Sequence, residues 1–472
     1  MFSSEQWLAN SGSNFYNGQA TQSVRFEGDN SAGFLSRTGM SASNRRTWTW
    51  SCWVKRINLD ANTQGIFGMI DLSSVNRQCY IAFDSNHKIY IMNYSQNAGD
   101  AVYNYVTTQV FRDLSAWYHI VWVSDTTNGT AGDRIRLYVN GVRITSFTIA
   151  TNPSQNYEGW INGDGGSGVQ LGVGRVVPYA PSAEYLASYM SDANFVDGLA
   201  LAPTNFGEFK SGACWIPIEP DVSDYGTNGF RLKFDQVGVG TASSSTIGAD
   251  SSGKTNHYTS SGIVASDCSI IDSPENNFCT WNPLTSGAQT TFAEGNLKLA
   301  SVWSSDLSGG ASTFFPESGK WYWELRIDGA GSYPYIGITS QEKTNATVNG
   351  GTNYNIGWTV GGTASSVGSS LGTVTKENIP SFADDDIMSF ALDVDARKLW
   401  VAKNNAYADS GNPENGSGEN ASWTLDVGIS PVIMGYNGQG VGTVANFGQD
   451  ASFAGAITAG TETDGTGAVF KY

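Results

Sequence analysis

Large apolar side chains alternate with polar ones along several stretches of this chain. In residues 318–327 the alternating positions include Trp321 and Trp323, and the same period of two runs through 47–55 and 135–144. A period of two places one row of side chains on a buried strand face and the other row toward water. These stretches are therefore predicted to be strands of sheets that enclose an apolar core.

The composition favours strands over helices throughout. Charged residues make up 15 % of the chain, whereas about 25 % is usual in globular domains. Their place is taken by polar uncharged residues and by 56 glycines, which suit tight turns and lower helix propensity. A length of 472 residues exceeds one ordinary core and indicates two or three domains. The expected fold class is all-β.

The charge and the cysteines exclude several classes of protein. The net charge is −17 and there is no run of Lys or Arg, so nucleic acids and anionic membranes are not expected as partners. No segment approaches the ~20 apolar residues of a membrane span. The five cysteines are widely spaced without a Cys-x-x-Cys pair, which predicts neither a disulfide framework nor a zinc site.

Two sets of strand patterns resemble known families. Residues 318–327 and 385–401 resemble the opening and central strands of a SPRY domain, a β-sandwich that binds partners through its loops. Residues 47–55, 117–123 and 135–144 resemble the laminin-G-like, concanavalin A-like jelly roll. The resemblances imply two jelly-roll or β-sandwich domains joined by a turn-rich connector. They imply recognition rather than catalysis.

Changes in pattern along the chain suggest four parts. Residues 1–20 are predicted to be an N-terminal docking arm, 21–210 a laminin-G-like jelly roll, 211–287 a connector or small β subdomain, and 288–472 a SPRY-like sandwich. Within the third part, the run 272–284 is rich in Pro and Asn, which favours turns. This run resembles a connector of phage structural proteins.

An adhesin-like composition without a disulfide framework or a secretory signal suggests a phage protein. Such a protein is made in the host cytoplasm and works on the virion surface. The predicted function is a non-enzymatic virion surface protein, of fibre or decoration type, that displays lectin-like domains for host-surface glycans. Expected partners are capsid, portal, tail or fibre proteins, with no membrane insertion and an oligomeric or docked state. A capsid decoration protein without a ligand and a glycan depolymerase are the alternatives.

The depolymerase alternative requires catalytic groups. Retaining glycosidases hold two carboxyl groups about 5 Å apart, and a Glu-x-Asp-x-x-Glu pattern that would supply them on one strand is absent. Glu324 and Asp328 could share a strand face, but a solvated edge is the simpler interpretation. His119 is interpreted as a structural strand residue. A Ser-His-Asp site assembled from distant residues stays open, and the chain is not expected to be an enzyme.

Most aromatic residues occupy alternating strand positions and are predicted to be buried. A smaller set stands in loop-like contexts and forms the candidate ligand-binding residues: Tyr157, Trp160, Tyr179, Tyr333 and Tyr354. Exposed rings of this kind can stack on sugars beside the plentiful Asn and Asp side chains. They can equally be buried against a neighbouring subunit, and the sequence favours neither interpretation.

No cofactor is required by these patterns, but the laminin-G-like resemblance implies a possible Ca²⁺ site at the rim of the sandwich. Ca²⁺ prefers carboxylate, amide and backbone oxygens. The candidate ligands near the predicted rim are Asp125, Asp133 and Asn140. The alternative is that these residues only form turns.

Overall fold

In the computed structural model the prediction of an all-β chain is confirmed. The structure describes residues 16–28, 32–59, 62–71, 77–95, 101–163, 166, 168–179, 182–286, 290–301, 308–330, 335–340, 356–366, 370–435, 441–463 and 468–472. These residues form strands and single-turn 3₁₀ helices, and no α-helix occurs among them. No described helix is long or apolar enough to cross a membrane.

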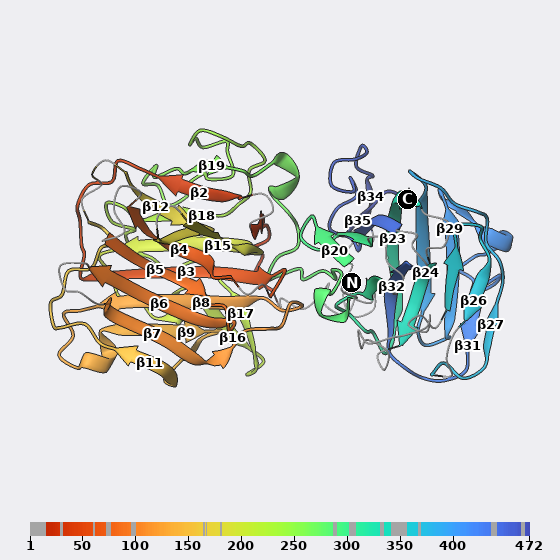
Figure 1. Ribbon diagram of the computed structural model, residues 1–472, viewed down its shortest axis with the longest axis horizontal. Helices are drawn as coiled ribbons and strands as arrows, with labels where there is room; N and C mark the ends of the chain where they lie inside the picture. The colour runs from red at the N-terminus through yellow and green to blue at the C-terminus, as the bar shows by residue number, and fades with distance from the viewer. Residues whose placement is uncertain are drawn as a thin grey trace. The chain divides into compact units, whose positions relative to one another are not determined.

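The chain folds as two compact units. The first comprises Phe15–Asn277, and the second contains Phe278–Tyr472. Both are built from antiparallel sheets, and many of their strands are labelled in Figure 1.

Two sheets face each other in the first unit. A seven-stranded sheet has the strands β1 (Val24–Glu27), β15 (Ala187–Asp197), β3 (Thr47–Arg56), β8 (Tyr118–Asp125), β9 (Ile135–Val139) and β10 (Val142–Arg143) in this order, with β18 (Phe230–Leu232) paired to β15. An eight-stranded sheet has β11 (Phe147–Thr151), β7 (Ala101–Val110), β6 (Lys88–Ser95), β5 (Arg77–Phe83), β4 (Gln64–Asp71), β12 (Val169–Val173), β2 (Phe34–Arg37) and β19 (Thr259–Ser261).

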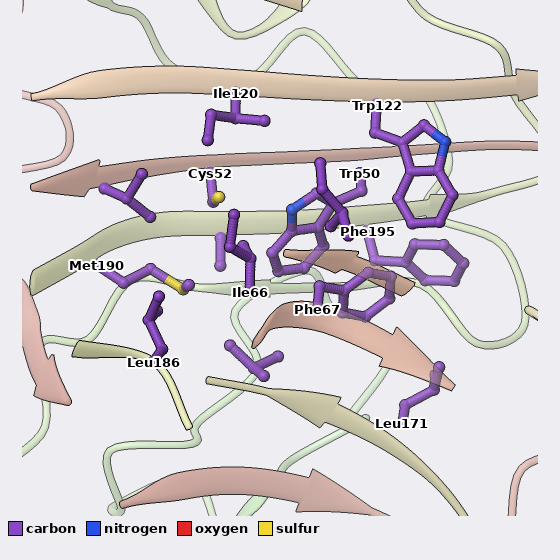
Figure 2. Close-up of a cluster of buried hydrophobic side chains, with 14 of the residues drawn as sticks. Trp50, Cys52, Ile66, Phe67, Ile120, Trp122, Leu171, Leu186, Met190 and Phe195 are labelled. Atoms are coloured by element: carbon purple, nitrogen blue, oxygen red, sulfur yellow. The ribbon is translucent and has the colours of Figure 1, made fainter. Parts of the chain in front are cut away.

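Aromatic residues fill the space between these sheets (Figure 2). Trp50 of β3 stacks on Phe67 of β4, with ring centroids 4.0 Å apart and the rings almost parallel. Trp48 meets Trp122 edge to face at 4.5 Å. Cys52 is fully buried on the same strand face as Trp48 and Trp50, as the alternation along 47–55 predicted.

The outer face of the seven-stranded sheet is also buried, which the alternation did not predict. Trp53 and Tyr189 point outward from β3 and β15, yet they are 3 % and 0 % exposed. Trp215 and Ile270 pack against them in a second apolar cluster. Trp215 belongs to a hairpin of β16 (Gly207–Lys210) and β17 (Cys214–Pro217), so the chain after residue 200 covers this face.

Most of residues 211–287, which were predicted to be a connector or small β subdomain, pack within the first unit, which extends to Asn277. Its strand β18 pairs with β15, and β19 pairs with β2. Lys55 of β3 forms an ion pair of 2.8 Å with Asp272, and both side chains are at most 1 % exposed. The sequence could not reveal this packing, because few of the covering residues form regular strands.

The described end of the predicted docking arm lies on the first unit. The Glu275 carboxylate accepts backbone hydrogen bonds from Asn17, Gly18 and Gln19, the last at 2.8 Å. The Asn17 side-chain amide donates to the Pro217 carbonyl oxygen at 3.0 Å. Burial raises the pKa of Glu275 to about 7. Residues 1–15 lie outside the described part of the chain.

The second unit is a β-sandwich as well. Its nine-stranded sheet contains β20 (Thr290–Ala293), β21 (Lys298–Ser301), β33 (Val441–Asn446), β23 (Lys320–Ala330), β28 (Ile387–Asp393), β29 (Lys398–Lys403), β31 (Ala421–Trp423), β27 (Val374–Lys376) and β30 (Ala406–Tyr407). Its five-stranded sheet contains β22 (Ser308–Ala311), β32 (Ile429–Gly435), β24 (Tyr335–Ser340), β25 (Ile356–Thr359) and β26 (Ala364–Ser366). Trp323 and Phe390 stack in its core at 4.9 Å.

Replacing Lys55 with Met tests whether the covering segment is essential to the first unit. We expect the free energy of unfolding to fall by about 3–5 kcal/mol, because the substitution leaves the Asp272 carboxylate buried without its cation. Urea denaturation of the full chain measures this loss. The matched control is Lys254→Met, since Lys254 pairs with Asp224 at an exposed position, where solvent screens the pair and its loss should change stability little. Equal losses in the two variants would contradict the expectation.

Candidate functional site

The two sheets of the first unit differ in their outer faces. The seven-stranded sheet is covered, as described above. The eight-stranded sheet is covered at β4 and β5 by a hairpin of β13 (Arg175–Tyr179) and β14 (Ser182–Tyr185). A Cβ added to Gly65 of β4 would lie 2.5 Å from the Val176 nitrogen of this hairpin. Beyond the hairpin, on β6, β7 and β11, the outward side chains are partly or fully exposed, except that of Met92, which is buried in a cluster with Val176 of the hairpin.

Outward residues of these three strands form a surface that we call the open face. It consists of Tyr90, Met92, Tyr94, Asn104, Val106 and Ile149. The cross-strand register places Tyr90 beside Val106, and Val106 beside Ile149. In the same way Met92 pairs with Asn104. Side chains opposite each other on antiparallel strands point to the same face, so the six residues lie side by side.

The open face combines aromatic rings with an amide. Tyr90 and Tyr94 are half-buried, and the Tyr90 ring meets Tyr80 edge to face at 5.7 Å. The side-chain carbonyl oxygen of Asn104 is itself buried and has no hydrogen-bond partner among the described residues. Ile149 is 46 % exposed. Apolar surface with a few polar groups is typical of small-molecule sites, and tyrosine rings offer flat apolar faces together with a hydroxyl group.

Sequence reasoning missed these residues. Tyr90, Met92 and Tyr94 alternate with Ile89, Ile91 and Asn93, so both faces of β6 carry large side chains. Alternation distinguishes the two faces of a strand, but it does not say which face a second layer covers. The signal that could have been used is the row of two tyrosines and a methionine at every second position.

Two of the predicted ligand-binding residues, Tyr157 and Trp160, are half-buried and pack against the core between the two sheets. The structure brings them together through the buried amide of Asn93. Its Nδ2 donates to the Tyr157 hydroxyl at 3.0 Å, and its Oδ1 accepts from the Trp160 backbone at 3.1 Å. The indole Nε1 of Trp160 donates to the Tyr94 carbonyl oxygen at 2.7 Å. Burial raises the pKa of Tyr157.

The ring of Trp160 already has cationic neighbours. The Arg45 and Arg77 guanidinium carbons lie 5.5 Å and 5.4 Å from its centroid, within the range of cation–π attraction. Arg45 is fixed by donating to the Gly159 carbonyl oxygen at 2.7 Å. The side chain of Arg77 is 49 % exposed. A ligand stacking on Trp160 would compete with these arginines, so Trp160 is better suited to form the rim of a site than its floor.

The side chains of the other three candidate aromatic residues are not among those that the structure describes. Tyr179 is the last residue of β13, and its side chain is not among those described. Tyr333 and Tyr354 lie outside the described residues. Their predicted role in ligand binding stays a prediction.

The three candidate calcium ligands do not come together. The Asp125 backbone N–H donates to the Arg134 carbonyl oxygen at one end of β8, next to Asp133. The Asn140 side chain accepts from the His119 backbone at the other end. Six residues of strand span about 20 Å, whereas Ca²⁺ ligands lie within 2.6 Å of the ion. A single ion cannot bind all three residues.

The candidate carboxylates also have protein partners. Asp133 pairs with Arg143 at 2.6 Å, and Asp125 accepts from the Thr127 hydroxyl at 2.6 Å. Among the described residues, neither Asp125 nor Asp133 belongs to a group of three acidic, His or Cys ligand atoms within 4.8 Å of one another. The structure therefore does not bring Asp125, Asp133 and Asn140 together around one ion, and calcium binding at this rim stays a prediction.

His119 is buried beneath the covering layer in a fixed tautomer. The Trp215 indole Nε1 can only donate, and it lies 2.9 Å from His119 Nδ1. Nδ1 is therefore the acceptor, and Nε2 donates its hydrogen to the Ser51 hydroxyl at 2.9 Å. In this tautomer the imidazole cannot accept the hydroxyl proton of Ser51 at Nε2. Desolvation lowers the pKa of His119 to about 3, which fits the structural role predicted from the sequence.

Glu324 is a structural carboxylate in the second unit. It is fully buried and accepts backbone hydrogen bonds from Lys471 and Tyr472, each at 2.8 Å. Burial raises its pKa. Asp328 pairs with Lys298 at 2.6 Å. The two acidic residues are four positions apart on β23, about 13 Å along a strand, which exceeds the separation in a retaining glycosidase.

One family matches the first unit. A family model described as the concanavalin A-like lectin/glucanases superfamily matches residues 15–172. Together with the two facing sheets, this match identifies the fold of the first unit as a concanavalin A-like jelly roll. No curated protein sequence matches the chain.

Solved structures of β-sandwich proteins resemble parts of the chain. The SPRY domain of human HERC1 is 16 % identical, covering 35 % of this chain and 96 % of that domain, with a TM-score of 0.26. A Bacteroides ovatus protein proposed to bind carbohydrate is 14 % identical, covering 52 % of this chain and 59 % of that protein, with a TM-score of 0.35. The CBM40 domain of the Ruminococcus gnavus IT-sialidase is 12 % identical, covering 36 % of this chain and 95 % of that domain, with a TM-score of 0.26. Similarities at this level carry no argument about function.

The buried His119 should make stability depend on pH. Its pKa of about 3 in the folded chain lies below the value near 6.5 of an unfolded chain. The unfolded state therefore binds more protons between these values, and the folded state loses up to about 1.4 kcal/mol per pH unit as pH falls from about 6.5 toward 3.

We expect the His119→Gln variant to lose this part of the pH dependence, since Gln does not titrate. The measurement is the difference in unfolding free energy between wild type and variant at pH 6 and pH 4. Parallel pH profiles for the two proteins would show that His119 is not held neutral in the folded state.

Proposed function

We propose that this protein binds glycans, without cleaving them, on the open face of its first unit. The observation that carries the proposal is the difference between the two sheets of the jelly roll. One sheet is covered on both faces, whereas the other leaves Tyr90 and Tyr94 half-buried beside Asn104. Pyranose rings have apolar faces that stack on tyrosine, and their hydroxyl groups are hydrogen-bond partners for an amide.

The open face suits an uncharged or weakly charged ligand. None of its six residues is acidic, although the chain carries 43 Asp and Glu residues. Arg77 stands at the rim next to Trp160, where it can reach a hydroxyl or a carboxylate of a bound sugar. The lectin-like fold of the first unit supports a binding role, but fold alone does not determine function.

The histidine and the glutamate considered above as catalytic groups both have structural hydrogen-bonding roles. Among the groups considered, His119 is held as a hydrogen-bond donor to Ser51, and Glu324 fixes the last two residues of the chain. These roles support binding over hydrolysis. Glycan depolymerisation remains the alternative, so a binding experiment should also test whether the bound glycan is cleaved.

We further propose that the protein is displayed on the surface of a phage virion, attached to capsid, tail or fibre proteins. The support comes from the sequence resemblances and from the cysteines. All five are free thiols in the structure, and four of them are buried, which suits a protein assembled in a reducing cytoplasm. Binding to host-surface glycans would then serve adhesion. A capsid decoration role without a ligand is the competing possibility.

Replacing Tyr94 with Ala should weaken glycan binding about 5- to 30-fold. The variant removes one stacking ring, worth about 1–2 kcal/mol, and keeps the backbone carbonyl that Trp160 uses. A glycan array identifies a ligand, and calorimetry with that ligand measures the change. Phe209→Ala is the control, because Phe209 is an exposed ring (48 %) on the covered sheet's outer layer. Equal weakening by both substitutions would place the binding site elsewhere.

Imaging of labelled particles tests the proposed location. We expect an antibody against this protein to decorate purified virions of the phage that encodes it. Labels at the tail or fibre tips would support adhesion, and labels spread over the head would support the decoration alternative. Absence of the protein from purified particles, checked by mass spectrometry, would refute the virion proposal while leaving glycan binding untouched.

A further inference from the structure

The strand β11 ends the eight-stranded sheet and has an exposed, uncharged edge. It pairs with β7 on one side and with no described strand on the other. The last four of its five residues, Thr148–Thr151, are exposed. The whole stretch 144–157 contains no charged residue. An exposed edge strand presents unpaired N–H and C=O groups that can pair with another strand.

The strands at the other ends of the four large sheets are better protected. Each is shorter than β11. The edge β1 is mostly buried, β10 contains Arg143, and β27 contains Lys376. Short length and charge are the usual means by which proteins prevent pairing at an edge. Only a bulge between Phe147 and Ile149 interrupts β11, and the rest of the strand keeps regular pairing with β7.

We propose that β11 pairs antiparallel with β11 of a second copy of this chain, which joins two eight-stranded sheets edge to edge. An antiparallel strand pair related by a two-fold axis is self-complementary and closes as a dimer. In the register centred on Ala150, Ile149 of each copy lies opposite Thr151 of the other. Pairs of β-branched residues across antiparallel strands are favourable, and both side chains are exposed in the single chain.

Charge favours a second copy at this edge. Two chains with a net charge of −17 each repel one another wherever their acidic surfaces meet. The stretch 144–157 is free of charge, so contact there adds little repulsion. Two cations lie near the edge: Arg134 donates to the Pro153 carbonyl oxygen at 2.8 Å, and the Lys88 ammonium lies 3.5 Å from the Thr148 hydroxyl oxygen.

The dimer would extend the open face across two copies. Ile149 belongs both to β11 and to the open face, so it would lie at the seam between two adjoining sets of tyrosines. This consequence rests on the proposed function, because two linked sites bind a multivalent glycan surface more tightly than one site does. The dimer itself does not depend on glycan binding.

Sedimentation velocity of the full chain, without glycan and over a range of concentrations, tests the proposal. We expect wild type to sediment as a dimer with twice the 50.4 kDa mass of one chain. Ile149→Lys and Thr151→Lys should be monomeric, because each places a charge at the seam. The control is Val237→Lys, since Val237 is 64 % exposed outside β11 and should leave the dimer intact.

A monomeric wild type, or a dimer that resists both β11 substitutions, would overturn the proposal. Circular dichroism of the variants establishes that they are folded. Failure of the glycan proposal is recognised separately, by a dimeric wild type that binds no array glycan. If both proposals hold, Thr151→Lys, whose residue lies outside the open face, should weaken binding to a glycan-coated surface at least 10-fold while binding of a soluble monovalent glycan stays unchanged.

Discussion

The buried contact between β3 and the segment that ends the first unit determines which surfaces this protein can use. Lys55 and Asp272 are withdrawn from water together, and Trp117 donates its indole N–H to the same carboxylate at 3.2 Å. Next to them, the Trp215 ring stacks near His119. A charge pair in such a place is tolerated only if its partners stay paired, so the covering layer is held firmly. The seven-stranded sheet thus becomes an interior element, whereas the outer face of the eight-stranded sheet stays partly exposed.

Both units use a buried glutamate to fix a segment near an end of the chain. Glu275 binds the backbone of Asn17–Gln19, and Glu324 binds the backbone of Lys471 and Tyr472. Burial raises the pKa of both carboxyl groups, while the backbone N–H groups oppose that shift. Carboxyl groups placed in this way look like catalytic acids when only their pKa is considered. Their hydrogen bonds show that each one organises the chain instead.

The sequence predicted local features well and the second layer poorly. Asn-Gly is a strong local signal for a tight hairpin, and Asn140 and Gly141 between β9 and β10 both have the positive φ that such a turn requires. Alternation correctly identified the buried row of β23. The covering layer was not predicted because its contacts leave no periodic signal in the sequence. Trp215 packs on Gly141, which has no side chain. Lys55 and Asp272 pair across 217 residues of chain. For the same reason Tyr90 and Tyr94 were assigned to no site, whereas the loop context of Tyr157 and Trp160 predicted a binding role for them.

The open face and the β11 edge differ from the rest of this acidic chain in their lack of acidic residues. This chain maintains a strongly acidic surface, which favours solubility, yet the open face and the adjoining β11 edge carry no carboxylate. A contiguous apolar patch is a risk for aggregation unless something occupies it. A face of tyrosines, a methionine and an amide binds sugar rings without the penalty of desolvating a carboxylate. An uncharged edge next to it permits association of like-charged chains. The two features therefore have one common physical cause, the exclusion of acidic residues from one side of one sheet.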